Sequence, residues 1–292
     1  SGVVQMHQHP PFRYGHVKMF RVDLRELATD PRGNNSELIG QKIVERELGQ
    51  IRSPDIVASD MSMRWVRFGI KRGMALVDNM QSEVLAGYGR DAEGLIDRFE
   101  ALDPVQVFAP VLDFLPVETS RVLDVGAGTG RDAAWLARAG HVVTAVEPVA
   151  AFRSAGQSLH SGLDLTWSAD HLPDLTELRQ AGALYDLLIL NGVWHHLRLP
   201  ERESALHALR CLAAPAARLV ISVRNGPAPA GRPSYGGEAG RLLGQARDIG
   251  LSVRCHKKEA SIQPQNLAAG VTWDWLVLEV SGAEEGKGKL GN

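Results

Sequence analysis

The sequence predicts an α/β domain in which helices cover both faces of a doubly wound, mostly parallel sheet. Between residues 121 and 280, short apolar runs alternate with longer segments of helical periodicity. The run at 185–190 is largely apolar, as expected for a strand buried on both faces. A glycine-rich turn connects the run at 121–125 directly to a predicted helix at 131–139. A strand, a tight glycine turn and a helix in this order form the first βα unit of such a sheet.

The predicted elements follow one another with the alternation that this fold requires. Two helices are expected before the first strand, at 88–100 and 104–114. After the glycine turn, strands and helices alternate up to the last strand. The further expected strands are 141–146, 163–167, 185–190, 218–223, 251–256 and 271–280. The further expected helices are 148–158, 201–212 and 238–249, and a Gly- and Pro-rich loop is expected at 224–237.

Residues 1–80 give a weaker signal, and we expect an N-terminal extension that is mainly helical and partly disordered. Residues 1–20 contain three histidines without periodicity, which favours a disordered tail over a metal site. A helix is predicted at 36–48, where a possible N-cap precedes apolar residues at helical spacing. The segment 61–74 carries four positive charges, no acid and interleaved aromatic residues. It either packs its apolar side on the body of the protein or contacts nucleic acid or a membrane surface.

The domain organisation follows from these patterns. After the extension, one domain is expected at 81–280, and a Gly-, Lys- and Glu-rich tail at 281–292 is expected to be disordered. No apolar run approaches the roughly 18 residues that span a bilayer. Two cysteines, Cys211 and Cys255, cannot build a disulfide framework. We therefore expect a cytoplasmic protein without a membrane segment.

Charge is distributed unevenly along the chain. Residues 1–80 carry 12 lysines and arginines against 9 acidic residues, whereas the rest carries 20 against 25. A slightly acidic body argues against a large surface for nucleic-acid phosphates. Nucleic acid is therefore an unfavoured partner, and no feature of the sequence sets an oligomeric state.

The centre of the chain combines three glycines with two acidic residues. Gly126, Gly128 and Gly130 follow the first strand, and Asp124 stands two residues before the first of them. Glycine permits left-handed backbone and lets a ligand approach the main chain closely. The N–H groups at the start of the following helix point at such a ligand. The next apolar run ends in Glu147, where an acid can accept hydrogen bonds from ribose hydroxyls.

The glycine spacing differs from that of a dinucleotide loop, whose third glycine would stand where this chain has Arg131. The glycine triplet, together with Asp124, Glu147 and the order of the later elements, resembles class I S-adenosylmethionine-dependent methyltransferases over residues 83–280. The resemblance implies a seven-stranded, Rossmann-like sheet with six parallel strands and an antiparallel last strand. It also implies S-adenosylmethionine as the cofactor. An NAD-dependent oxidoreductase is a weaker alternative, because residues for hydride chemistry are not recognisable.

The resemblance also implies how individual residues hold the cofactor. The glycines bring bare backbone to the methionine and ribose, and Asp124 orders the loop or attracts the ammonium group. Glu147 accepts hydrogen bonds from both ribose hydroxyls. Asp170 faces the adenine amino group with Leu172 against the ring, and Tyr88 is a candidate for the methionine end. The expected cofactor-binding residues are Tyr88, Asp124, Gly126, Ala127, Gly128, Gly130, Glu147, Pro148, Asp170, His171, Leu172 and Asn191.

The segment after the fourth strand is expected beside the reacting methyl group. His195 and His196 are candidate general bases, because an imidazole can take a proton from an O–H or N–H group. A structural role is the alternative for both, since methyl transfer does not strictly require a base. Trp194 is expected either to line the substrate pocket or to pack in the core.

The loop at 224–237 should face the same rim, and long loops in compact domains are often functional. Arg224, Arg232 and Tyr235 are candidates to hold a carboxylate or phosphate on the acceptor. The alternative is a solvated loop edge.

These expectations describe an S-adenosylmethionine-dependent methyltransferase that acts on an oxygen or nitrogen atom of a small molecule, without a metal. One alternative is an RNA or protein methyltransferase that docks through 61–74. Against transfer to the exocyclic amine of a base, residues 191–194 read Asn-Gly-Val-Trp and not an Asn-Pro-Pro-Tyr-type tetrapeptide. The other alternative is a non-catalytic S-adenosylmethionine-binding module.

Overall fold

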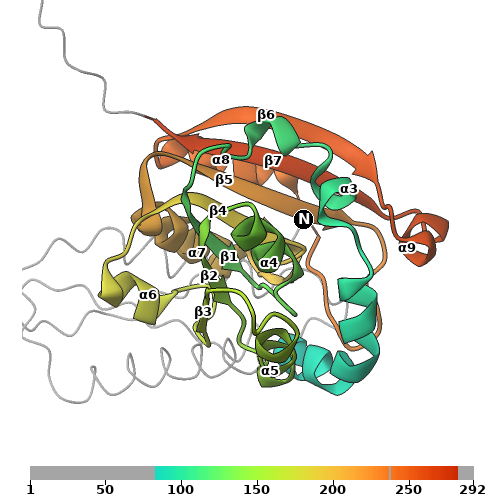
Figure 1. Ribbon diagram of the computed structural model, residues 1–292. Coiled ribbons are helices and arrows are strands. Elements are labelled where there is room, and N and C mark those ends of the chain that lie inside the picture. Colours follow the sequence, from blue (N-terminus) through green and yellow to red (C-terminus); the bar gives the residue numbers. More distant parts are fainter. Residues whose placement is uncertain (1–82, 237, 282–292) are drawn as a thin grey trace, which may run out of the picture. The chain divides into compact units, whose positions relative to one another are not determined.

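The computed structural model describes residues 83–236 and 238–281, which lie in the second of two units of the chain, Gly69–Asn292. In this part of the chain, seven strands form one sheet in the order β3-β2-β1-β4-β5-β7-β6 (Figure 1). The strands are β1 Arg121–Val125, β2 Val142–Val146, β3 Leu165–Ser168, β4 Tyr185–Asn191, β5 Ala213–Asn225, β6 Leu251–Ala260 and β7 Thr272–Val280.

The strand directions match the predicted fold. β1 pairs in parallel with β2 and β4, β2 with β3, and β4 with β5. β7 is antiparallel to both β5 and β6. The predicted sheet of six parallel strands and an antiparallel last strand is therefore confirmed. The strand order reverses between β1 and β4, and ligands of such sheets bind there, beyond the carboxyl ends of the strands.

The central strands are buried on both faces and alternate between two cores. In β4, Leu188 and Leu190 belong to one hydrophobic cluster, whereas Leu187 and Ile189 belong to the other. This alternation is the period-two pattern of a strand. Each such side chain contributes about 1.5–3 kcal/mol through burial, so β4 is a well-anchored support for the residues that follow it.

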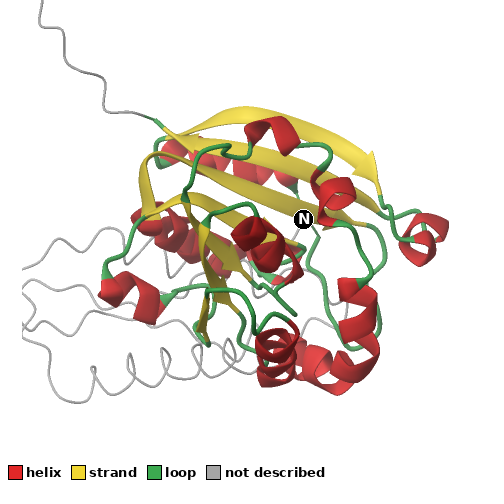
Figure 2. Ribbon diagram, viewed as in Figure 1, coloured by secondary structure: helices red, strands yellow, loops and turns green. Residues whose placement is uncertain are grey.

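Helices supply the opposite walls of these two cores (Figure 2). Leu178, Leu206 and Leu242 from α6, α7 and α8 join one cluster, and Phe108 and Leu136 from α3 and α4 join the other. The helices are α3 Pro104–Phe108, α4 Arg131–Arg138, α5 Ala150–Leu159, α6 Thr176–Ala181, α7 Leu199–Leu212, α8 Ala239–Asp248 and α9 Pro264–Ala268. Two 3-10 turns are η2 Leu112–Phe114 and η3 Trp194–His196, and helical backbone also occupies 83–100.

The helix at 83–100 packs against α5 and not against the sheet. Ala92 and Leu95 form a separate small cluster with Val149 and Phe152. This places the helix beyond the carboxyl ends of the strands, where it can border a ligand site.

Some elements differ from the sequence predictions for local reasons. The helix expected at 104–114 ends at Phe108, because Pro110 has no backbone N–H that could continue the helical hydrogen bonds. β5 begins at Ala213 and not at 218, because Ala213 already pairs with Tyr185 of β4. An irregularity separates this pair from the regular pairing that starts at Arg218. The short helices α6 and α9 were not predicted, since so few residues do not establish a helical period.

Several predictions concern residues that the structure does not describe. These are the extension at 1–80, with its helix at 36–48 and its segment at 61–74, and the tail after residue 281. Cys211 and Cys255 are free thiols. In the described ranges, no helix combines the length and the apolar character needed to cross a membrane.

Candidate active site

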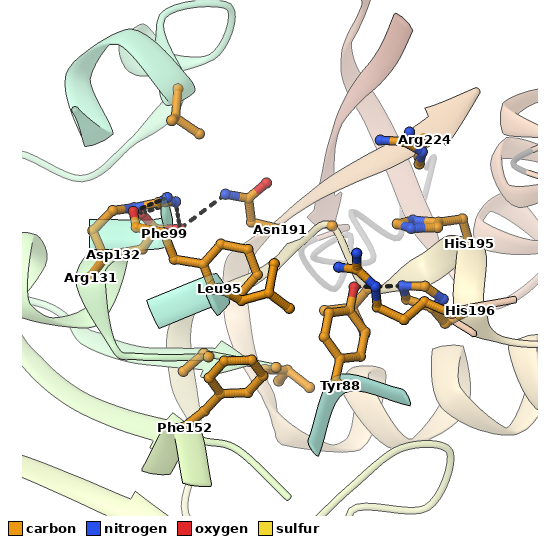
Figure 3. A pocket seen from close by; sticks show the side chains of 18 of the residues that line it. Tyr88, Leu95, Phe99, Arg131, Asp132, Phe152, Asn191, His195, His196 and Arg224 are labelled. Atoms are coloured by element: carbon orange, nitrogen blue, oxygen red, sulfur yellow. Dashed lines mark hydrogen bonds and ion pairs between the residues drawn. The ribbon is translucent and has the colours of Figure 1, made fainter. Parts of the chain in front are cut away.

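A cavity of about 330 Å³ lies at the carboxyl ends of the strands. In Figure 3, Leu95 and Phe99 border one side of it, and His195 and Arg224 border the other. Its volume is typical of sites for small molecules. The predicted cofactor-binding residues that line it are Tyr88, Gly126, Ala127, Gly128, Glu147, Pro148, Asp170, His171, Leu172 and Asn191. The predicted acceptor-side residues that line it are His195, His196, Arg224 and Arg232.

Three glycines shape the turn between β1 and α4. Gly126, Gly128 and Gly130 have φ angles of 74°, 57° and 77°, a left-handed range that penalises side chains. The Gly126 N–H donates to the Val146 oxygen at 2.8 Å, which ties the turn to the end of β2. A Cβ on Gly126 would overlap the side chain of Val193. The turn therefore requires glycine both for its backbone geometry and for its packing.

Glu147 follows β2, and its carboxylate is bonded to the glycine turn. Oε2 accepts a hydrogen bond from the Gly128 N–H at 2.8 Å, and Oε1 accepts one from the Val149 N–H at 2.7 Å. The residue is 5% exposed. Burial raises the pKa of Glu147 to about 7, although the two backbone hydrogen bonds oppose the shift. Each oxygen can accept a further hydrogen bond, so Glu147 can hold two hydroxyl groups of a ligand.

Asp124 is buried beneath the turn and is not among the residues that line the cavity. It accepts a hydrogen bond from the backbone N–H of Ala133, and its Oδ2 has no partner among the described residues. Burial, and then the neighbouring Asp132, raise the pKa of Asp124 well above its usual range. This position suits the expected ordering of the turn, and attraction of an ammonium group, directly or through water, stays a prediction. Gly130 likewise faces Trp167 and not the cavity.

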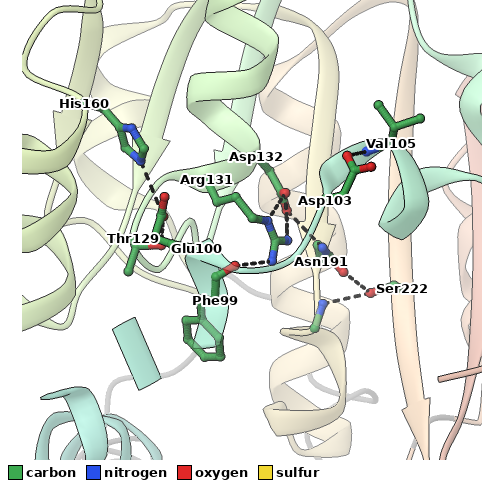
Figure 4. A network of polar contacts seen from close by, with 11 residues as sticks. Phe99, Glu100, Asp103, Val105, Thr129, Arg131, Asp132, His160, Asn191 and Ser222 are labelled. Atoms are coloured by element: carbon green, nitrogen blue, oxygen red, sulfur yellow. Dashed lines mark hydrogen bonds and ion pairs between the residues drawn. The ribbon is translucent and has the colours of Figure 1, made fainter. Parts of the chain in front are cut away.

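A polar network links the turn to the ends of β4 and β5 (Figure 4). Arg131 forms an ion pair with Asp132 at 2.7 Å. Asn191 donates from Nδ2 to Asp132 Oδ2 at 2.9 Å, and its Oδ1 accepts from Ser222 Oγ at 2.8 Å. Asn191 is thus held in a single orientation at the point where the strand order reverses.

Asp170 follows β3, and its carboxylate accepts hydrogen bonds from the backbone of the loop that leads to α6. Its Oδ1 accepts from the His171 N–H at 2.9 Å, and its Oδ2 accepts from the Leu178 N–H at 3.0 Å. Leu172 is buried beside it and adds apolar surface to the cavity wall. Asp170 therefore orders this loop, and each of its oxygens retains one site for a ligand donor.

His196 connects three segments around the cavity. Its Nδ1 lies 2.6 Å from the Pro233 oxygen, and its Nε2 lies 2.9 Å from Tyr88 Oη. A carbonyl only accepts, so Nδ1 carries the proton and Nε2 accepts the Tyr88 hydroxyl. Burial lowers the pKa of His196 to about 4 and raises the pKa of Tyr88. Both groups are neutral near pH 7, and they join the helix at 83–100 to the loops after β4 and β5.

His195 has a different environment. It is 3% exposed, and its ring meets Trp273 edge-on at a centroid distance of 5.8 Å. Its Nδ1 is buried and makes no hydrogen bond to the described residues. Burial, and then the charges of His196, Arg224 and Arg202, lower the pKa of His195 well below its usual range. The ring is therefore a neutral imidazole near pH 7.

Two residues expected to contact the acceptor do not line the cavity. Trp194 is fully buried in the hydrophobic core, so the packing alternative applies to it. Tyr235 donates its backbone N–H to the His195 oxygen at 2.8 Å. Its contribution to the site is therefore to hold the backbone of His195.

Two arginines lie at the acceptor side of the cavity. The guanidinium of Arg224, at the end of β5, lies 5.7 Å from the centre of the Trp273 ring. The guanidinium of Arg232 lies 5.2 Å from the centre of the Tyr88 ring and forms an ion pair with Asp91 at 3.4 Å. Both residues line the cavity, and their contact with an acceptor stays a prediction.

A comparison with protein-family models matches a methyltransferase domain to residues 95–268, which is more than half of the chain. This chain belongs to the methyltransferase domain family. The match begins within the helix at 83–100 and ends in α9, so it includes the glycine turn and both histidines. The predicted family and the predicted enzyme class are confirmed.

A solved methyltransferase shares this fold. The 1,6-didemethyltoxoflavin-N1-methyltransferase of Burkholderia thailandensis, with bound 1,6-didemethyltoxoflavin and S-adenosylhomocysteine, is 18% identical with a TM-score of 0.55. The match covers 79% of this chain and 93% of that one. The magnesium protoporphyrin IX methyltransferase of Synechocystis PCC 6803, with bound S-adenosylmethionine, is 20% identical, with 69% and 84% of the chains covered and a TM-score of 0.45. Among curated proteins, none matches the sequence.

The methyltransferase cavity also contains residues that the sequence did not single out. Phe99 and Phe152 form an aromatic wall with a ring distance of 5.6 Å, and Trp273 lies at the start of β7. Asp132 was missed because an acid in the first turn of a helix reads as a favourable charge at that end. The aromatic residues were missed because, in a helix or strand pattern, they cannot be distinguished from core residues.

Proposed function

We propose that this methyltransferase uses S-adenosylmethionine to methylate an oxygen or nitrogen atom of a small molecule. The observation that supports the proposal is the continuity of the cavity, which extends from the glycine turn and Glu147 to His195 and Arg224. Its first end offers bare backbone and a carboxylate, which suit a nucleoside. Its second end offers aromatic and basic groups, which suit an acceptor molecule.

The residues at the donor end fit S-adenosylmethionine. A Cβ on Gly128 would lie 3.6 Å from the Phe99 ring, so the bare turn faces the space beside that ring. The free lone pairs of Glu147 accept hydrogen bonds from the ribose hydroxyls. Leu172 packs against the adenine, and Asp170 accepts a hydrogen bond from its amino group.

S-adenosylmethionine would supply a methyl group bonded to a positively charged sulfur. The acceptor lone pair would form the new bond to the methyl carbon, and the sulfur would leave as the neutral thioether of S-adenosylhomocysteine. The protein contributes alignment of the two molecules and exclusion of water. We assign acceptance of the acceptor's proton to His195, because its buried Nδ1 makes no hydrogen bond to the described residues. His196 is a positioning residue, because both of its ring nitrogens already have partners.

A macromolecular acceptor is the alternative, and it would dock through the segment 61–74, which lies outside the described residues. Burial of the acceptor end favours a small molecule. His195 and Arg224 are 3% and 7% exposed, and they are reached through a cavity whose walls include the helix at 83–100. A molecule small enough to enter the cavity can contact both side chains.

Calorimetry with S-adenosylmethionine tests the donor site. We expect the wild type to bind and Glu147→Lys to bind roughly 100-fold more weakly or not at all, because a buried acceptor pair is replaced by a cation. Glu118→Lys makes the same charge change at an exposed residue and should bind normally. A whole-cell extract, incubated with labelled methyl donor and then separated into small molecules, RNA and protein, identifies the acceptor. Absence of binding by the wild type, or label found only in RNA or protein, would overturn the proposal.

A further inference from the structure

We propose that the methyl acceptor carries a carboxylate group that pairs with Arg224. This inference rests on the proposed function, because it gives the chemical class of the molecule at the acceptor end of the cavity. The arginines that line the cavity are Arg98, Arg131, Arg224 and Arg232. In the part of the chain that the structure describes, they differ in how their charges are balanced.

The charges of three of these arginines are balanced or screened. Two of them form ion pairs with acidic residues, and the third is exposed to solvent. Arg131 forms an ion pair with Asp132 at 2.7 Å, and Arg232 forms one with Asp91 at 3.4 Å. Arg98 is exposed, so solvent screens its charge. None of them therefore requires a negative group from a ligand.

Arg224 is buried and has no acidic partner among the described residues. Its Nη2 donates to two neutral oxygens, Pro227 O at 2.8 Å and Asn266 Oδ1 at 3.1 Å. Its Nε is buried without a hydrogen bond to the residues that the structure describes. Burial lowers the pKa of Arg224; Tyr88 raises it, Arg232 lowers it, and no carboxylate acts on it. A buried cation is costly unless it is paired, and an anion of the ligand would supply the missing charge.

The groups around Arg224 favour a carboxylate on a flat molecule. The guanidinium lies over Trp273, and a planar carboxylate can form parallel hydrogen bonds with a guanidinium. The Trp273 ring offers an aromatic face near the same group. His195 lies on the same side of the cavity as Arg224 (Figure 3), and burial lowers the pKa of His195, so its neutral ring adds no second positive charge there.

S-adenosylmethionine also carries a carboxylate, and the sheet topology separates the two possibilities. Glu147 follows β2 and Arg224 ends β5, with β1 and β4 between these strands. Neighbouring strands are roughly 4.8 Å apart, which places the two positions roughly 14 Å apart across the sheet. A donor whose ribose is held at Glu147 has its methionine end near β1 and β4, which leaves Arg224 for the acceptor.

Ligand-observed NMR with protein saturated in S-adenosylhomocysteine tests this assignment. The probes are benzoate and 4-hydroxybenzoate, each compared with its uncharged primary amide. We expect the acids to bind the wild type at least roughly tenfold more tightly than the amides, because a hydrogen bond to a charged group is worth more than one to a neutral group. Arg224→Gln should abolish this preference. Arg218→Gln, on the same strand but paired with Glu279, should keep it.

Calorimetry with S-adenosylhomocysteine on the same three proteins separates the possible failures. If the acids bind no better than the amides, or Arg224→Gln leaves their preference unchanged, the acceptor assignment is overturned while the proposed function stands. If Arg224→Gln weakens S-adenosylhomocysteine binding and leaves the acids unaffected, Arg224 holds the donor, and the assignment is again overturned. If the wild type does not bind S-adenosylhomocysteine, the proposed function fails as well. Circular dichroism of each variant shows whether the fold is retained.

Discussion

The carboxyl group of Glu147 changes its charge in the neutral pH range, because burial raises its pKa to about 7. Only the ionised form offers both oxygens fully to the ribose hydroxyls. We predict that the affinity for S-adenosylhomocysteine rises roughly tenfold between pH 6 and pH 8, in proportion to the ionised fraction. Calorimetry at pH 6, 7 and 8 measures this rise. A Glu147→Gln variant should bind weakly and without this pH dependence, and a flat profile in the wild type would contradict the prediction.

Without a ligand, the same group makes stability fall as pH rises. The folded protein keeps the Glu147 proton up to a pKa of about 7, whereas the unfolded chain loses it near pH 4.5. The contribution of this group to stability is therefore lost progressively between these two values. Ligand binding and unliganded stability should respond to pH in opposite directions across this range.

The two adjacent histidines should give different kinetic effects when each is replaced. We predict that His195→Gln lowers kcat by roughly 100-fold or more, the usual contribution of a general base. His196→Gln should mainly raise KM, because an amide can still donate to Pro233 but positions Tyr88 less well. Steady-state kinetics with the acceptor found by methyl labelling measures both effects. Equal losses of kcat in the two variants would contradict the assignment of separate roles.

For single residues, the sequence predicts a role where that role depends only on the local backbone conformation. The glycine turn needs positive φ angles at Gly126, Gly128 and Gly130, and this need is visible in the spacing alone. The burial of Asp124 and Trp194 is not visible, because it depends on which way the turn and the η3 segment face in the folded chain. Arg224 was predicted to face an acceptor, but its lack of an acidic partner emerges only from the packing.

Among the elements, α5 packs against the glycine turn at Gly156. Gly156 lies in its middle, and a Cβ there would overlap the carbonyl oxygen of Thr129 and the ring of Trp167. We predict that Gly156→Ala lowers the free energy of unfolding by about 1–3 kcal/mol, the usual cost of overpacking. It should also weaken S-adenosylhomocysteine binding, because the turn must move. Chemical denaturation and calorimetry measure the two effects.

A matched control for this prediction exists in α8. Gly244 also lies within a helix, but a Cβ there would meet no atom within 4 Å. Gly244→Ala should stabilise the protein by about 0.5–1 kcal/mol, because alanine has the higher helix propensity. If both variants were equally stable, the proposed contact between α5 and the turn would be wrong.

The sequence predicts elements well where a long apolar run or a long helical period exists. β4 and β7 agree closely with the predicted runs at 185–190 and 271–280. The early start of β5 was not predicted, because its first residues include Pro215 and exposed positions that do not resemble a strand. Whether such residues join a strand depends on pairing with a neighbouring strand, which is a long-range effect.

For the whole molecule, the helix at 83–100 joins the catalytic domain through contacts around the cavity. Tyr88 bonds to His196, and Glu100 accepts a hydrogen bond from Thr129 at 2.5 Å. We predict that S-adenosylhomocysteine slows amide hydrogen exchange in 83–100 and 226–236 more than in α7, because only the first two segments border the cavity extensively. Hydrogen-exchange mass spectrometry with and without the ligand measures this difference. Equal protection of all three segments would mean that binding stabilises the fold uniformly.

The overall architecture was predicted in two steps with different physical support. Periodicity predicts that strands and helices alternate, but not the order of the strands. The resemblance to a methyltransferase implied the strand directions, which are confirmed, whereas the order, with β1 beside β4, comes from the structure. The position of the helix at 83–100 beside the cavity depends on contacts between distant parts of the chain, and no local pattern contains that information.

The order of the binding residues along the chain also has an evolutionary consequence. The groups suited to the nucleoside precede β5 in the chain, whereas Arg224, Arg232 and Trp273 all belong to the segment 213–281. Recombination between relatives within the segment that connects β4 to β5 would therefore exchange much of the surface that selects the acceptor. The hybrid would inherit its donor-binding residues from one parent and much of its acceptor specificity from the other.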